Sequence, residues 1–129
     1  MYRILLFVGA GGFLGSIARY LSQQLVIKYY GDIFPLGTLI VNIAGCLLIG
    51  VLYGFMDRGK LLYPETRLFL TTGFCGGFTT FSAFSIENII MLNKGEYFYV
   101  LIYVALSVIL GLGATYLGMM AVKALWYKV

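Results

Sequence analysis

The residues best suited to chemistry in this sequence lie at positions 76–88, which read GGFTTFSAFSIEN. The segment combines two glycines, four hydroxyl side chains, three phenylalanines and one carboxylate. Carbonyls freed by a helix interruption can coordinate a cation, while freed N–H groups and hydroxyls can face an anion. Aromatic ring edges carry partial positive charge and can line a path for a small anion. These residue types indicate ion binding or ion passage.

Enzymatic chemistry is not indicated elsewhere in the chain. There is no histidine, and no general base is paired with a nucleophile. Cys46 and Cys75 both sit in apolar runs and match no metal or redox spacing, so we interpret them as buried thiols. The formal net charge of +4 is spread over the expected helix ends. That placement suits lipid headgroups and predicts no nucleic-acid partner.

The composition is that of an integral membrane protein. Hydrophobic residues make up 61% of the chain and charged residues 11%, against about 25% charged in ordinary soluble domains. A bilayer core needs roughly 20 apolar residues per helix. Four segments qualify, at residues 4–27, 36–56, 68–92 and 97–122. They predict an all-α protein with a single four-helix transmembrane domain over residues 1–129.

The first apolar segment could be mistaken for a signal peptide with a small-residue cleavage site. Its apolar pattern continues past Arg19, however, as in a mature membrane helix. The third segment contains CGGFTTFS, which combines glycines and β-branched threonines and is a poor helix former. We therefore expect the third helix to be broken in mid-membrane near residues 76–80, where protein or a cavity must satisfy the backbone.

Several polar residues fall at membrane depth, where such groups usually face protein or a water-filled path. Thr38 and Asn42 are four residues apart on one helix face, and Tyr103 and Ser107 begin a similar stripe. Each has a structural alternative, since a buried Asn often bonds two helices together and hydroxyls often bond back to their own helix. Phe81 and Phe84 share a face, either as path-lining rings or as plain packing.

The segment GFCGGFTTFSAFSIE closely resembles the central signature of the CrcB/Fluc family of fluoride channels. GGFLGSIARY and PLGTLIVNIAGCLLIG are similar to the family's first-helix and second-helix motifs, and the agreement covers essentially the whole chain. The resemblance implies a passive channel that exports cytoplasmic fluoride across the bacterial plasma (inner) membrane and lowers its toxicity. It also implies an antiparallel dual-topology dimer with two pores and a structural sodium ion at its centre.

Site residues can be carried over by motif. The resemblance implies that the backbone carbonyls of Gly76 and Thr79 in each subunit hold the sodium ion. Arg19 matches the first-helix arginine near a vestibule. The residues matching the fluoride path are Thr38, Asn42, Phe81, Ser82, Phe84, Glu87, Tyr103 and Ser107. Ala83 departs from the family pattern, which often has Thr or Ser there, so one hydroxyl of the path is missing.

Charge placement bears on how the chain inserts. The termini and the 57–67 loop are expected on one side of the membrane, and that side carries most of the basic residues: Arg3, Arg58, Lys60, Arg67, Lys123 and Lys128. The other side carries Lys28 and Lys94. The positive-inside rule favours cytoplasmic termini. Two expectations stay open, a homodimer or a heterodimer with an oppositely oriented homologue, each surrounded by membrane lipid.

Two other functional classes compete with a fluoride channel. A small multidrug-type exporter also forms antiparallel dimers, but it couples protons to cationic drugs through a carboxylate in the first span. Residues 4–27 contain no carboxylate, and the plausible acid at membrane depth is Glu87. A non-transporting membrane assembly factor would need neither the polar faces nor the broken helix. Fluoride conduction remains the leading hypothesis.

Overall fold

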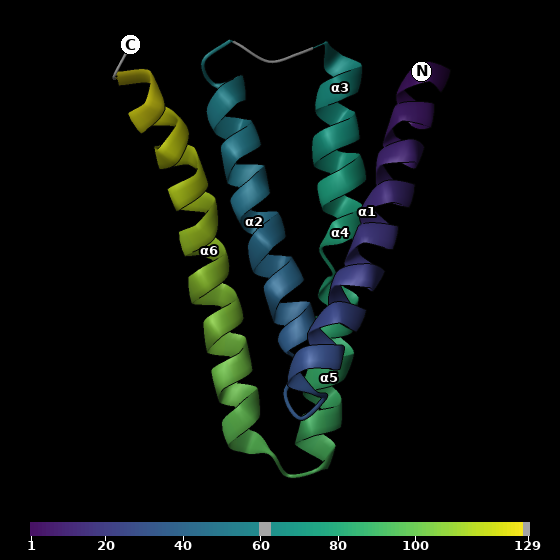
Figure 1. The fold of residues 1–129 in the computed structure, drawn as a ribbon, viewed down its shortest axis with the longest axis vertical. Helices are drawn as coiled ribbons and strands as arrows, with labels where there is room; N and C mark the ends of the chain where they lie inside the picture. The colour runs from purple at the N-terminus through teal and green to yellow at the C-terminus, as the bar shows by residue number, and fades with distance from the viewer. Residues whose placement is uncertain (60–62, 128–129) are drawn as a thin grey trace.

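The computed structural model describes residues 1–59 and 63–127, and every regular element within these ranges is a helix (Figure 1). The elements are α1 (Tyr2–Tyr30), α2 (Leu36–Met56), α3 (Pro64–Leu68), the π-helix η1 (Phe69–Cys75), α4 (Gly76–Phe78), α5 (Phe81–Asn93) and α6 (Tyr97–Tyr127). The prediction of an all-α protein is confirmed.

Three of these helices, α1, α2 and α6, are long and apolar enough to cross a membrane. The short elements α3, η1, α4 and α5 follow one another along a further path through the molecule (Figure 1). Helix α2 covers the segment expected at 36–56. Helices α1 and α6 continue beyond the expected 4–27 and 97–122, because a helix does not have to end where its apolar run ends.

The start of α1, the end of α2, the start of α3 and the end of α6 lie at the same end of the molecule (Figure 1). Arg3 and Glu65 approach to 3.8 Å at this end and link α1 to α3. Two of the basic residues counted for orientation, Lys60 and Lys128, fall outside the described residues. The α1–α2 and α5–α6 connections lie at the opposite end, where Gly31 and Gly95 adopt positive φ angles of 77° and 75°.

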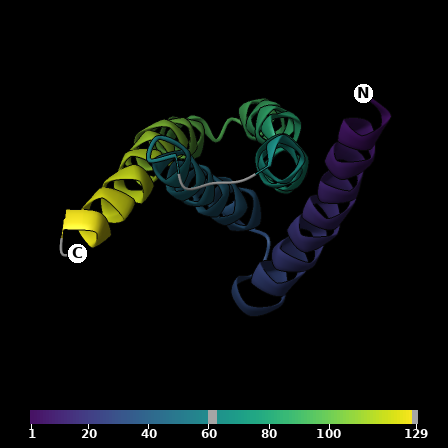
Figure 2. The same cartoon turned by 90° about the horizontal axis from the view of Figure 1, so that it is seen from above.

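Helix α2 is the central element. It packs along α6 and contacts α1, η1, α4 and α5, whereas α1 packs mainly along η1 and α4. In the view from above, α2 lies between α6 and α1 (Figure 2). A small core forms around Leu39, Met91 and Tyr103, from α2, α5 and α6. Residues that reach between helices near this core are therefore candidates for a site.

Glycines allow the closest helix contacts. A Cβ atom on Gly77 would lie 2.5 Å from the carbonyl oxygen of Gly12, and one on Gly11 would collide with the carbonyl oxygen of Phe69. Gly118 of α6 meets the backbone of α2 at Leu47 in the same way. Backbone-to-backbone packing of this kind is typical of helices that associate in membranes.

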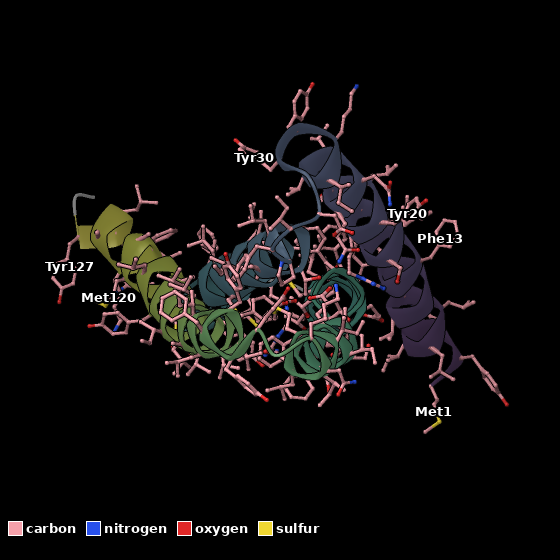
Figure 3. All side chains as sticks on the ribbon, turned by 90° about the horizontal axis from the view of Figure 1, so that it is seen from below. Met1, Phe13, Tyr20, Tyr30, Met120 and Tyr127 are labelled. Atoms are coloured by element: carbon pink, nitrogen blue, oxygen red, sulfur yellow. The ribbon has the colours of Figure 1, made fainter. Side chains whose placement is uncertain are left out.

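The outer faces of the helices are apolar and exposed in the single chain. Phe13 and Tyr20 point away from the other helices on α1, and Met120 and Tyr127 do so on α6 (Figure 3). Such a surface has no favourable contact with water, so it is suited to lipid or to another protein surface.

Candidate ion path and helix interruption

The helical backbone between η1 and α5 is interrupted at two residues. Thr79 has φ −83° and ψ 155°, and Thr80 has φ −149° and ψ 111°, which are extended conformations. Gly76 and Gly77 belong to α4 and are helical, so the interruption is narrower than residues 76–80 and falls on the threonines. Thr80 caps α5, since its hydroxyl accepts a 3.2 Å hydrogen bond from the N–H of Ala83.

Asn42 of α2 holds the extended backbone at Thr80. Its Oδ1 accepts from the Thr80 N–H at 2.7 Å, and its Nδ2 donates to the Thr80 carbonyl at 3.1 Å. Both backbone groups of a buried residue are thereby satisfied by one amide. Because Nδ2 carries two protons, Asn42 can hold Thr80 and still donate a second hydrogen bond. The sequence singled out Asn42, but it did not indicate this partner.

The capping pattern deprives two carbonyls of their usual donors. In an uninterrupted α-helix the Thr80 N–H would donate to the Gly76 carbonyl, and the Ala83 N–H to the Thr79 carbonyl. Here those donors bond to Asn42 Oδ1 and Thr80 Oγ1 instead. The two carbonyls concerned are the pair expected to hold sodium. Gly76 and Thr79 also line a common groove of about 390 Å³, together with Asn42 and Phe81.

Arg19 of α1 reaches the same interruption from the other side. Its Nε donates a 3.0 Å hydrogen bond to the Gly77 carbonyl, which in a continuous helix would accept from Phe81. The side chain is partly buried and places a permanent positive charge next to the extended residues. The family resemblance implies that Arg19 lies near a vestibule. In the structure its side chain also hydrogen-bonds to the backbone carbonyl of Gly77.

A second polar cluster joins three helices. The Thr38 hydroxyl donates to Glu87 Oε1 at 2.5 Å, and the Tyr103 hydroxyl donates to Glu87 Oε2 at 2.6 Å. Thr38 is 3% exposed and Tyr103 is fully buried. Each carboxylate oxygen thus accepts a hydrogen bond, which offsets the cost of holding a charge away from water. The structure brings together residues from positions 38, 87 and 103.

Gln23 of α1 was not singled out from the sequence. Its Nε2 lies 3.2 Å from Thr38 Oγ1 and donates to it, which adds a fourth helical segment to the cluster. The sequence feature that could have indicated Gln23 is its spacing. It lies four residues after Arg19 and so shares the same face of the helix.

The aromatic rings extend from this cluster toward the interruption. Phe84 lies 5.0 Å from Tyr103 between ring centroids, and Phe81 lies 5.5 Å from Phe84. Phe84 is partly buried, whereas Phe81 is 78% exposed on the single chain. The Ser82 hydroxyl lies 3.2 Å from the Thr80 hydroxyl at the same place. Tyr103, Phe84 and Phe81 therefore form a continuous row of rings that ends at the protein surface.

Two buried polar atoms, Ser107 Oγ and Asn88 Oδ1, have no hydrogen-bond partner within the described residues. Ser107 lies one helical turn beyond Tyr103 on α6, on the same face. Asn88 uses its Nδ2 to bond the Phe84 carbonyl at 2.8 Å. A buried hydroxyl without a protein partner needs a water or an ion to satisfy it, which is compatible with the expected place of Ser107 beside a path.

A hollow of about 530 Å³ leads to the Thr38–Glu87 cluster from the end that carries the α1–α2 and α5–α6 connections. Gln23, Thr38 and Glu87 lie in its wall. Charged residues also line it, namely Asp32, Lys94 and Glu96. Glu87 in the wall of the hollow and Tyr103 in the row of rings are joined by their hydrogen bond of 2.6 Å.

These features define a class of protein: small, multi-pass helical membrane proteins with polar side chains gathered between apolar helices. The family model described as "CrcB-like protein, Camphor Resistance (CrcB)" matches residues 6–119. The chain belongs to this family, and the resemblance drawn from its motifs is confirmed.

Relatives of similar length share much of the sequence. A "Fluoride-specific ion channel FluC" of Flavobacterium psychrophilum is 44% identical over 123 residues, covering 95% of this chain and 99% of the relative. One of Chlorobium phaeobacteroides (strain BS1) is 49% identical over 125 residues, covering 97% and 96%. One of Leptospira interrogans serovar Lai is 45% identical over 119 residues, covering 92% and 94%. The chain is thus a multi-pass membrane protein of a bacterial channel family, not an enzyme.

Proposed function

We propose that this protein is a passive, fluoride-selective channel that lets cytoplasmic fluoride leave a bacterial cell across its plasma membrane. The observation that carries the proposal is the near-full-length similarity, at 44% and 49% identity, to proteins named as fluoride-specific channels. The multidrug-exporter alternative has no comparable support, because α1 contains no Asp or Glu to couple protons.

The proposed route starts in the hollow beside Glu87 and continues along the rings to the interruption. A small, strongly hydrated anion has to be offered donors in place of water, yet must not be held too tightly to leave. Hydroxyls, an amide N–H and ring edges meet that requirement better than a row of fixed cations. The path would be formed by the residues matched to the family: Thr38, Asn42, Phe81, Ser82, Phe84, Glu87, Tyr103 and Ser107.

A second subunit completes this route in the proposal. Phe81 is 78% exposed, although it belongs to the row of rings, and it borders the groove that contains Gly76 and Thr79. A second chain placed against this groove would cover the ring and enclose the path. We propose an antiparallel dual-topology dimer with two pores, built from two copies or from this chain and an oppositely oriented homologue.

The proposal includes a sodium ion at the centre of the dimer, where the third segment is broken in mid-membrane. The carbonyls of Gly76 and Thr79 fit such an ion, since their helical donors are used elsewhere and carbonyl oxygens suit hard cations. Two subunits would supply four carbonyls. The bound ion would satisfy these carbonyls and place positive charge near both anion routes.

Fluoride efflux from liposomes tests the proposed function. Purified protein is reconstituted alone in vesicles loaded with potassium fluoride, and release is followed with a fluoride electrode after potassium permeability is added. We expect rapid fluoride release and far slower chloride release from matched vesicles. Absence of fluoride release by folded protein, alone and with an oppositely oriented homologue, would overturn the proposal.

A further inference from the structure

We propose that Gln23 is a positioning residue of the anion route: it donates to the Thr38 hydroxyl and thereby commits the proton of that hydroxyl to Glu87. The proposal rests on the fluoride-channel function proposed above, and it adds a control point on α1 that the family motifs do not include.

The hydrogen bonds run in one direction, from Gln23 through Thr38 to Glu87. Gln23 Nε2 donates to Thr38 Oγ1 at 3.2 Å, and Thr38 Oγ1 donates to Glu87 Oε1 at 2.5 Å. A threonine hydroxyl has a single proton and two acceptor lone pairs. Because that proton goes to the carboxylate, the remaining contact of Thr38 has to be with a donor, and the amide nitrogen of Gln23 is one.

Accepting a hydrogen bond strengthens the donation made by the same hydroxyl. Gln23 therefore favours the arrangement in which Thr38 faces Glu87 over one in which it bonds a backbone carbonyl one turn back, at Phe34 or Pro35. With Tyr103 donating to Glu87 Oε2 at 2.6 Å, both carboxylate oxygens are then covered by donors. A covered carboxylate repels a passing anion less than a bare one, which ties the orientation of Thr38 to flux.

Packing fixes Gln23 in this position. Gly37, the residue before Thr38, is buried against the stem of Gln23. A Cβ atom on Gly37 would lie 3.3 Å from Gln23 Cα and 3.4 Å from Gln23 Cγ, so the missing side chain lets α1 and α2 approach there. The close approach brings the amide within reach of Thr38.

Other groups, three of them charged, also line the hollow. They are Tyr20 of α1, Asp32 of the α1–α2 connection, and Lys94 and Glu96 of the α5–α6 connection. Gln24 also lines the hollow, and it offers the same side chain one residue away from Gln23. It is therefore a matched control.

A double-mutant cycle on initial fluoride efflux tests the proposal. Gln23→Met keeps the length of the side chain but removes its donor, and we expect flux to fall about two- to tenfold, as for the loss of one ordinary hydrogen bond. In a Thr38→Val background the same change should alter flux less than about twofold. In a Thr38→Ser background, which keeps the hydroxyl, the loss should persist. Gln24→Met should have the same effect in all three backgrounds, because Gln23 is the side chain that bonds Thr38.

Equal loss from Gln23→Met in the Thr38→Val and wild-type backgrounds would overturn the proposal, as would a loss from Gln24→Met that depends on Thr38 in the same way. If Thr38→Val lowers flux below detection, the same cycle is measured on thermal unfolding in detergent, where additive effects would overturn it. Gln23→Glu is the second variant, and it accepts instead of donating. Its added negative charge should lower flux in every background, but the loss should be larger in the wild-type and Thr38→Ser backgrounds than in the Thr38→Val background. Wild-type protein without any fluoride flux would instead overturn the proposed function.

Discussion

The side-chain amide of Asn42 hydrogen-bonds to both backbone groups of Thr80, as the backbone of a neighbouring strand does in a β-sheet. The two distances are 2.7 Å and 3.1 Å, and the residues lie 38 positions apart in the chain. An amide side chain has the same donor and acceptor as a peptide group, so it can replace a strand edge inside a helical protein. The extended backbone at the interruption depends on this pairing.

Replacing Asn42 by Ala should destabilise the fold as well as reduce flux. The change leaves the N–H and carbonyl of buried Thr80 without their partner, at about 1–3 kcal/mol for each unsatisfied group. Thermal unfolding in detergent measures the loss, and Asn93→Ala, at the exposed end of α5, is the control. An Asn42→Ala protein with wild-type unfolding temperature would show that the pairing does not hold the interruption.

Replacing Phe81 or Phe84 by Ile keeps apolar bulk and removes the polarised ring edge. We expect each change to lower fluoride efflux about two- to tenfold, in line with the usual strength of an aromatic contact, with folding largely intact. Phe13→Ile, on the outer face of α1, is the matched control (Figure 3). Unchanged flux in both test variants would mean that the rings only pack.

The contact between α2 and α6 should be sensitive to a single methyl group. A Cβ atom on Gly118 would lie 2.5 Å from the Leu47 carbonyl oxygen and 2.8 Å from the Val51 nitrogen. Gly118→Ala should therefore destabilise the protein by about 1–3 kcal/mol. Gly113→Ala, where nothing lies within 4 Å, should be neutral or stabilising by about 0.5–1 kcal/mol. The two unfolding temperatures in detergent should move in opposite directions or differ clearly; equal shifts would contradict the packing argument.

Removing sodium should weaken the proposed dimer. A ligand present at a hundredfold excess over its dissociation constant stabilises the folded state by about 2.7 kcal/mol. We therefore expect a lower unfolding temperature and a larger monomer fraction when sodium is replaced by N-methylglucamine at constant ionic strength. Because the proposed ligands are backbone carbonyls, exchanging the ion is a cleaner test than truncating Thr79. Identical stability in both solutions would speak against a structural ion.

The helical class followed from composition and the length of the apolar runs, because the bilayer restricts spanning segments to a few solutions. Gly11 and Gly15, four residues apart on α1, both pack against backbone atoms of residues 69–78, a contact that small residues at this spacing allow. Local helix propensity also pointed to the segment that contains Thr79 and Thr80. These features could be predicted because they depend on residues that are close together in the sequence.

Other features were beyond such patterns. The glycines at 76 and 77 suggested the interruption, yet they are helical, because Asn42 and Arg19 capture the backbone at Thr80 and Gly77 from other helices. The contact of Gln23 with Thr38 likewise depends on how α1 crosses α2. The π-helix at Phe69–Cys75 has no distinct residue pattern. These features depend on contacts between residues far apart in the sequence, and the spacing of residue types along the chain does not indicate such contacts.

An interrupted helix often acts as a hinge, but hydrogen bonds to other helices and to flanking residues restrain this interruption. Arg19 ties it to α1, Asn42 ties it to α2, and the hydroxyls of Thr79 and Thr80 bond to Cys75 and Ala83 on either side. Bending at the interruption would have to break several of these bonds together. In the proposed channel this segment would therefore act as a rigid joint, and flux would not depend on bending at the interruption.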